Sequence, residues 1–275
     1  MFTEPFMQRA LLAAVLLAPL CALLGVFVTA RRMAFFSDTI SHGALIGVAL
    51  GFLLGFAEPT VPLLAVSLLI AAAVFWLRQH TELTTDTIMA LLLSGSVALG
   101  VIILSLLKIR PGEIQRYLFG DILAIGPGEV WLAALLTVLV AAGLLFDLSP
   151  FSLLTLNEDL AQVCGVPVRR MNFFFVTVLT LTVAVSIRLL GILLVTALLV
   201  IPPAAARNLS RNLRQQLLWS VAFGLAGGVG GMAAAYQFDV PCGPAIVLVC
   251  ATIFLLSLGW KLSRRGDQPG AGATR

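Results

Sequence analysis

Apolar stretches of about 20 residues recur from one end of the chain to the other, and they restrict the possible folds more than any other feature. A helix of that length spans the roughly 30 Å hydrocarbon core of a bilayer. The chain is 60% hydrophobic and only 11% charged, whereas about a quarter of the residues of a soluble domain carry charge. The pattern therefore predicts an all-α, polytopic membrane protein with eight or nine transmembrane helices.

Nine stretches qualify as candidate crossings. They cover residues 9–30, 33–55, 60–77, 87–107, 129–147, 171–187, 190–206, 213–235 and 244–262. The sixth and seventh are short and separated only by RLLG, so they form either two crossings or one bent helix. We expect residues 1–262 to form a single transmembrane domain. The tail, residues 263–275, is polar and rich in Gly, Ala and Pro, and we expect it to be disordered in the cytoplasm.

The basic residues predict the orientation of the crossings. With the amino terminus outside, the cytoplasmic segments carry twelve Lys and Arg residues and the external segments carry five. The opposite topology would reverse this ratio and break the positive-inside rule. We therefore predict an external amino terminus and a cytoplasmic carboxyl terminus. Because the basic residues lie in short loops without interleaved aromatic side chains, the net charge of +4 does not indicate nucleic-acid binding.

Two connections are too long to be simple turns. The external one, residues 108–129, mixes basic residues such as Arg110 and Arg116 with acidic ones such as Asp121. Mixed charge suits steered, reversible docking of a partner outside the membrane. The alternative is a loop lying in the membrane interface and anchored by its aromatic residues.

The cytoplasmic connection, residues 147–170, contains a short amphipathic stretch from Thr155 to Cys164. Gly165 followed by Pro167 is typical of a helix end. We predict a cytoplasmic surface helix within residues 155–167. Such a helix is either a contact for a peripheral partner or an interfacial helix without one.

Asp38 and His42 stand out because they lie inside the second apolar stretch. On a helix that starts at the preceding arginines, Asp38 is about 9 Å and His42 about 15 Å into the membrane. Their i, i+4 spacing places them on one helix face, next to Ser37 and Ser41. Ionisable residues at such depth are costly and usually functional. The alternative is that Ser37 or Asp38 is the N-cap of a helix over residues 37–56, with His42 inert in its first turns.

The functional interpretation is a metal site. An imidazole and a carboxylate suit zinc or manganese better than magnesium or copper(I). A tetrahedral site needs four ligands, and a homodimer with its two-fold axis at this helix would supply Asp38 and His42 twice. The sequence permits this arrangement without requiring it. The other histidine, His80, falls in a polar cytoplasmic loop.

The chain contains no GxxxxGK[ST] motif, so it does not bind ATP in the P-loop manner. If transport is uphill and driven by ATP, a separate ATPase has to dock from the cytoplasm, and the 155–167 segment is the obvious contact. We therefore expect a transport subunit and not an enzyme.

Four segments together resemble the metal-ion permeases of bacterial ABC importers. They read RRMAFFSDTISHGALIGVALGFLLG at 31–55, YLFGDILAI at 117–125, GILLVTALLVIPPAAAR at 191–207 and DVPCGPAIVL at 239–248. The resemblance runs in register from about residue 5 to residue 262. The sequence is most similar to the zinc-uptake branch of this family, the ZnuB type. It departs from that branch at 91–100, where LLLSGSVALG lacks a histidine that zinc permeases carry in the fourth helix.

The resemblance implies a bacterial inner-membrane homodimer with two cytoplasmic ATP-binding subunits and a periplasmic metal-binding protein. It assigns the transported Zn²⁺, or alternatively Mn²⁺, to Asp38 and His42, with no permanently bound cofactor. It assigns ATPase coupling to the 155–167 segment, and the candidate residues there are Glu158, Asp159, Ala161 and Gly165. Docking of the binding protein is expected at Arg110, Arg116 and Asp121.

Three other functions are compatible with part of this pattern. The same machinery could import manganese or iron. A proton-coupled secondary transporter could use Asp38 and His42 as a relay, although the chain lacks a long inverted repeat. An intramembrane hydrolase is a poorer fit, because no HExxH motif occurs and one His with one Asp is too little for that chemistry.

Overall fold

The computed structural model describes residues 5–56, 59–107, 120, 125–146 and 148–266. This part of the chain is helical, with α1 (Pro5–Ala30), α2 (Ala34–Leu53), α3 (Thr60–His80), α4 (Thr85–Leu107), α6 (Pro127–Phe146), α7 (Leu148–Leu156), α8 (Glu158–Val163), α9 (Val168–Leu190), α10 (Ile192–Leu209), α11 (Leu213–Phe238) and α12 (Cys242–Gly266). Within the described residues, nine of these helices are long and apolar enough to cross a membrane. The predicted all-α transmembrane fold is confirmed.

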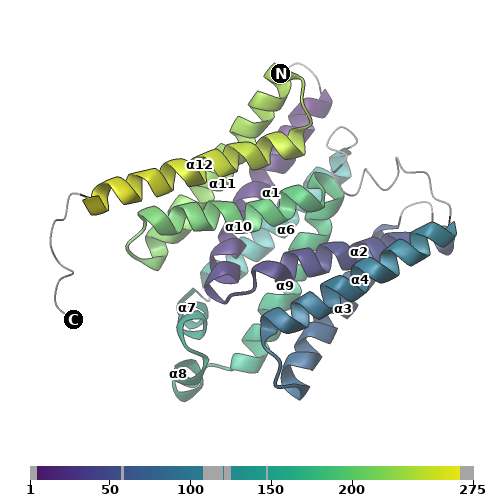
Figure 1. Cartoon of the computed structure of the whole chain (residues 1–275), viewed down its shortest axis with the longest axis horizontal. Helices are drawn as coiled ribbons and strands as arrows, with labels where there is room; N and C mark the ends of the chain where they lie inside the picture. The colour runs from purple at the N-terminus through teal and green to yellow at the C-terminus, as the bar shows by residue number, and fades with distance from the viewer. Residues whose placement is uncertain (1–4, 57–58, 108–119, 121–124, 147, 267–275) are drawn as a thin grey trace.

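The helices form two packed groups. One group contains α1, α10, α11 and α12, and the other contains α2, α3 and α4. Helix α9 contacts helices of both groups, and α10 of the first group contacts α2. Figure 1 shows the first group in the upper part of the molecule and the second at the lower right. Both α9 and α10 also contact α2, while α7 and α8 lie together at the lower left. Helix α2 is therefore enclosed by neighbours along much of its length.

Small residues allow α1 and α11 to pack backbone against backbone. A Cβ atom added to Gly224 would lie 2.9 Å from the carbonyl oxygen of Ala18. The hydroxyl of Ser220 donates a hydrogen bond of 2.7 Å to the carbonyl oxygen of Ala22. Close approach of this kind is how helices associate in a membrane, where lipid is as apolar as the side chains.

The sixth and seventh apolar stretches form two separate helices, α9 and α10. Gly191 joins them with φ of +83°, a conformation that favours glycine. Gly120 has φ of +76° and lies against this junction, since an added Cβ atom would be 2.5 Å from the carbonyl carbon of Leu190. Gly120 and Gly191, which belong to two of the sequence motifs, therefore lie together at a point where both segments of the chain need glycine.

The turn between α1 and α2 is tight. The amide of Met33 donates to the carbonyl oxygen of Val28 at 2.9 Å, and the amide of Arg32 donates to that of Thr29 at 3.3 Å. This pair of bonds is a Schellman motif, with Arg32 at φ of +56° in the position that glycine usually takes. Because of this turn, α2 already begins at Ala34.

The segment predicted as one surface helix within residues 155–167 is instead divided. Helix α7 ends at Leu156, and Asn157 starts α8 by accepting a hydrogen bond of 3.0 Å from the amide of Leu160. Asparagine in this position competes for backbone donors and so begins a new helix. The predicted stop is confirmed, because Gly165 has φ of +80° and a second Schellman motif closes α8.

The last helix is longer than predicted. We expected the final crossing to end at residue 262 and a disordered tail to begin at 263, but α12 continues to Gly266. The guanidinium of Arg264 lies 5.0 Å from the ring centre of Trp260, one turn earlier, and this contact favours the helical conformation of the last turn. The rest of the expected tail, residues 267–275, is outside the described residues.

Candidate functional site

Asp38 and His42 lie on consecutive turns of α2, and both side chains are half-buried. The helix begins four residues before Asp38, and its N-cap, Met33, makes no side-chain capping bond. The alternative that Ser37 or Asp38 caps the helix is therefore wrong, because the tight turn at Arg32 lets the helix start earlier. Within the described residues, neither Asp38 nor His42 has a hydrogen bond or an ion pair with another side chain.

Neighbouring polar residues on α2 serve the helix packing. The hydroxyl of Ser37 donates to the carbonyl oxygen of Ala34 in its own helix at 3.3 Å. The hydroxyl of Thr39 lies 2.8 Å from the carbonyl oxygen of Phe35 and 3.2 Å from that of Met89 on α4. Ser41 is buried, and its hydroxyl has no recorded partner among the described residues. These contacts hold α2 against α4 and leave the side chains of Asp38 and His42 uncommitted.

The helix face of Asp38 and His42 continues, at the same four-residue spacing, into Ile46 and Leu50. These two residues line a hollow of about 600 Å³ between α2, α3 and α4. The other lining residues are Val66, Leu69, Ile70, Leu91, Leu92, Gly95, Ser96 and Leu99. This lining offers no carboxylate, imidazole or thiolate, so the candidate ligands on this face are confined to the first turns of α2.

One copy of the chain presents too few ligands for a closed metal site. In the part of the chain that the structure describes, no three residues among His, Cys, Asp and Glu are grouped closely enough to hold a metal ion. His80 is committed elsewhere: its Nδ1 lies 2.9 Å from the carbonyl oxygen of Trp76, and its ring stacks on the Trp76 ring at 4.7 Å. One chain therefore offers at most the two candidate ligands Asp38 and His42, whereas a tetrahedral site needs four.

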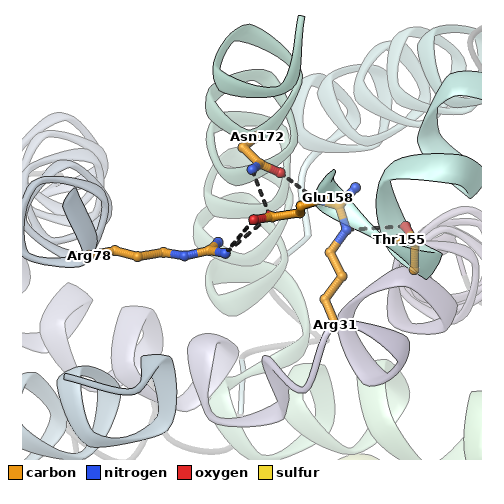
Figure 2. A network of polar contacts seen from close by, with 5 residues as sticks. All are labelled: Arg31, Arg78, Thr155, Glu158 and Asn172. Carbon is orange, nitrogen blue, oxygen red and sulfur yellow. Dashed lines mark hydrogen bonds and ion pairs between the residues drawn. The ribbon is translucent and has the colours of Figure 1, made fainter. Parts of the chain in front are cut away.

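A network of polar side chains connects the segments at the end of the molecule where α2 begins (Figure 2). Glu158, the first residue of α8, accepts hydrogen bonds of 3.0 and 3.2 Å from the guanidinium of Arg78 at the end of α3. It also accepts one of 3.0 Å from the side-chain amide of Asn172 on α9. The Arg78–Glu158 pair is 40% and 45% exposed, so it contributes at most about 1 kcal/mol to stability. Its effect is to fix the position of α8.

Arg31 completes this network from the turn before α2. Its Nη1 donates to the side-chain oxygen of Asn172 at 3.0 Å, and its Nε donates to the hydroxyl of Thr155 at 3.2 Å. The guanidinium carbon lies 4.4 Å from the ring centre of Phe175 and 5.8 Å from that of Phe151. Burial lowers the pKa of Arg31 to about 10, while the nearby charge of Glu158 opposes that shift. Arg31 thus stays charged at neutral pH.

The sequence reasoning missed this network. It used Arg31 and Arg78 only as markers of topology, and it did not consider Asn172. Apart from the bond between Asn172 and Glu158, which are 14 positions apart on two different helices, the contacts join residues 80 to 141 positions apart, so no local spacing reveals them. The one sequence feature that points to the network is the pair of adjacent arginines before the second apolar stretch. In the structure Arg31 is partly buried in the network and Arg32 is exposed.

The candidate coupling residues fall on and after α8, and they differ in exposure. Ala161 is fully buried, whereas Glu158, Asp159 and Gly165 are exposed. Leu160 is 51% exposed and other apolar residues around α8 are more so, including Leu156 at 82% and Val163 at 85%. The segment therefore buries one small residue against the protein and presents apolar side chains outward.

At the opposite end of the helices, Glu129 at the start of α6 binds Arg188 near the end of α9, with an N–O distance of 2.8 Å. Arg188 also donates to the hydroxyl of Thr60 at the start of α3. The candidate docking residues Arg110, Arg116 and Asp121 lie outside the described residues.

The fold and the site define a multi-pass helical membrane protein with a pair of uncommitted metal-type ligands inside one crossing. Residues 3–261 match the model of the ABC 3 transport family, so the chain belongs to that family. The sequence-based assignment to this family is confirmed.

Relatives and solved structures support the same conclusion. The chain is 34% identical to the high-affinity zinc uptake system membrane protein ZnuB of Haemophilus influenzae, over 90% of this chain and 95% of that protein. It is 28% identical to the manganese transport system membrane protein MntC of Halalkalibacterium halodurans, over 92% and 86% of the two chains. It superposes on PsaBC from Streptococcus pneumoniae, solved in complex with a Fab, with a TM-score of 0.81, 28% identity, and coverage of 93% and 91%.

Proposed function

We propose that this chain is the permease subunit of an ATP-driven importer that moves a divalent metal, zinc, into a bacterial cell. The observation that carries the proposal is the pair of Asp38 and His42 on one face of a membrane helix, half-buried and without a recorded protein partner. Ionisable residues in that position require a function, and their chemistry suits zinc. The similarity to ZnuB supports zinc, while MntC makes manganese the alternative cargo.

The transport site is formed by two copies of the chain. Each copy contributes a carboxylate and an imidazole, so a two-fold axis near α2 gives two oxygen and two nitrogen ligands. The absence of a third candidate ligand near the pair, within the described residues, supports this arrangement. The neutral imidazole and the ionised carboxylate are the forms that bind the ion. The ion crosses the membrane because one conformation of the permease binds it and another releases it.

Energy comes from separate ATP-binding subunits that dock on the cytoplasmic side at α8. The outward apolar side chains of Leu156, Leu160 and Val163 support this contact, since solvent would otherwise surround them. The ion is delivered from outside by a metal-binding protein that docks on the 108–129 segment. In this arrangement the amino terminus lies outside and the carboxyl terminus lies in the cytoplasm of the inner membrane, as the arginine distribution predicts.

The experiment that tests the proposal is metal uptake by membrane vesicles that contain the permease, its ATPase and its binding protein. A panel of Zn²⁺, Mn²⁺ and Fe²⁺ is offered with and without ATP. We expect ATP-dependent uptake that is strongest for Zn²⁺. Stronger uptake of Mn²⁺ would assign the other metal to the same machinery. Uptake driven by a proton gradient without ATP would overturn the proposal in favour of a secondary transporter.

A further inference from the structure

We propose that Asn172 and Arg31 are positioning residues that tie α8 to the start of α2, so that a displacement of α8 reaches Asp38 and His42. The inference rests on the proposed function, in which an ATPase moves α8. It goes beyond that function because it names the residues inside the permease that transmit the movement.

Helix α8 is fixed to its neighbours mainly at its first residue. Among the described residues, every recorded side-chain hydrogen bond from α8 to another helix is made by Glu158. Otherwise α8 buries only Ala161. A partner that pushes or pulls on the exposed side of α8 therefore acts on the other helices through the Glu158 carboxylate, in addition to the chain that joins α8 to α7 and α9.

Asn172 has the chemistry needed to pass this contact on. Its side-chain nitrogen donates to Glu158 at 3.0 Å, and its side-chain oxygen accepts from Arg31 at 3.0 Å. An amide can donate on one side and accept on the other, whereas an ionised carboxylate can only accept. In Figure 2 dashed lines run from the amide of Asn172 to both Glu158 and Arg31.

Arg31 in turn belongs to the turn that starts α2. Its guanidinium is held by Asn172, by Thr155 and by the ring of Phe175, so this turn cannot shift independently of α7 and α9. Asp38 follows seven residues later and lies about 6 Å along α2 from its first residue, Ala34. A second connection runs from Glu158 through Arg78 to the end of α3, which packs along α2.

Four variants separate the proposed connection from a general structural role. Asn172→Asp keeps an acceptor for Arg31 but replaces the donor to Glu158 with a repelling carboxylate. Glu158→Gln keeps an acceptor for Asn172 while it removes the charge. Arg31→Met fills the space against the aromatic rings without the hydrogen bonds. Arg32→Gly is the matched control, because it removes the neighbouring exposed arginine at a position whose φ suits glycine.

The first readout is the amount of zinc delivered per ATP hydrolysed by the complete complex in proteoliposomes. We expect Asn172→Asp and Arg31→Met to lower this ratio at least fivefold while ATP hydrolysis stays within twofold of the wild type. Arg32→Gly should keep a ratio within twofold of the wild type, whereas Glu158→Gln should lower the ratio because it removes the charge that binds Arg78. If Asn172→Asp retains the wild-type ratio, or if Arg32→Gly loses it as completely as Asn172→Asp does, the proposal is overturned.

The second readout needs the permease alone. Spin labels are attached to Cys164, which is exposed just after α8, and to a cysteine introduced at Phe35, which is 55% exposed on α2. The other three cysteines are replaced by alanine. We expect a narrow distribution of label distances in the wild type and a broad one in Asn172→Asp. An unchanged distribution would show that the connection does not exist.

The two readouts also distinguish this proposal from the proposed function. If the wild-type complex transports no metal, the proposed function fails, and the label distances still decide whether Asn172 connects α8 to α2. If the distances broaden in Asn172→Asp while zinc per ATP stays at the wild-type value, the connection is structural only and the positioning role is rejected.

Discussion

His42 follows Asp38 by one turn of α2, and neither side chain has a hydrogen bond or ion pair within the described part of the chain. We expect Asp38→Ala or His42→Ala to reduce zinc uptake at least about 10-fold, because changes to residues that merely support a ligand already cost about 10- to 100-fold. In the proposed two-fold site, each substitution would also remove two of the four ligands. Uptake in vesicles measures the effect, and the size of the purified complex checks that it still assembles. Normal uptake by the double variant would reject the metal site.

Breaking α8 should uncouple ATP hydrolysis from transport. Proline at Ala161 costs about 3 kcal/mol in a helix interior, which is enough to melt an element of six residues. We expect Ala161→Pro to lose metal-stimulated ATP hydrolysis and uptake while the membrane helices keep their thermal stability. The control is Ala161→Gly, which costs only about 1 kcal/mol at the same site. Unchanged metal-stimulated hydrolysis in Ala161→Pro would exclude α8 as the coupling element.

Gly120 should be essential for folding around the junction of α9 and α10. Its positive φ costs another residue about 1–2 kcal/mol, and the added Cβ atom would overlap the backbone at Leu190. We therefore expect Gly120→Ala to lower the thermal midpoint of the detergent-solubilised protein. Gly126→Ala is the control, because no atom lies within 4 Å of its added Cβ. Equal midpoints for the two variants would contradict the close contact at Gly120.

Charge reversal in residues 108–129, the segment predicted to be external, should weaken capture of the proposed metal-binding protein. We expect Arg110→Glu together with Arg116→Glu to lower the affinity for that protein and to change its dependence on salt, because exposed charges are screened over about 10 Å at 0.1 M salt. Metal preference should not change, since the proposed function assigns it to Asp38 and His42, deeper in the membrane. The measurement is binding at several ionic strengths. Altered zinc-over-manganese selectivity with intact docking would instead place this segment near the transport site.

The contribution of Arg31 to stability should not vary with pH in the physiological range. Burial lowers its folded-state pKa to about 10, below its ordinary value, so both the folded and unfolded states hold the proton below about pH 9. Above about pH 10 the unfolded state binds more protons until it too loses its proton, so stability associated with this group would rise with pH only there. We therefore expect the difference in thermal midpoint between wild type and Arg31→Met to be constant from pH 6 to 9. A difference that changes across this range would mean that another titrating group depends on Arg31.

The sequence by itself determined the fold class, the number of candidate membrane helices and the family. Apolar length and scarcity of charge are local properties, and a helix in lipid satisfies its own backbone hydrogen bonds, so each crossing can be recognised without its neighbours. The stop of α8 at Gly165 was predictable for the same reason, because a helix end depends on a few adjacent residues. The pairing of Asp38 and His42 on one face follows directly from helical periodicity.

The tertiary structure alone decided how these helices are connected. The start of α2 at Ala34 depends on the turn at Arg32, and the break at Asn157 divides a segment that reads as one amphipathic helix. The hydrogen-bond partners of Glu158 are Arg78 and Asn172, which lie on two different helices, α3 and α9. Such contacts depend on how distant segments pack together, and nothing in the local pattern of residues encodes their meeting. The same reason explains why Arg31 reads as an exposed topology signal in the sequence and lies among aromatic rings in the structure.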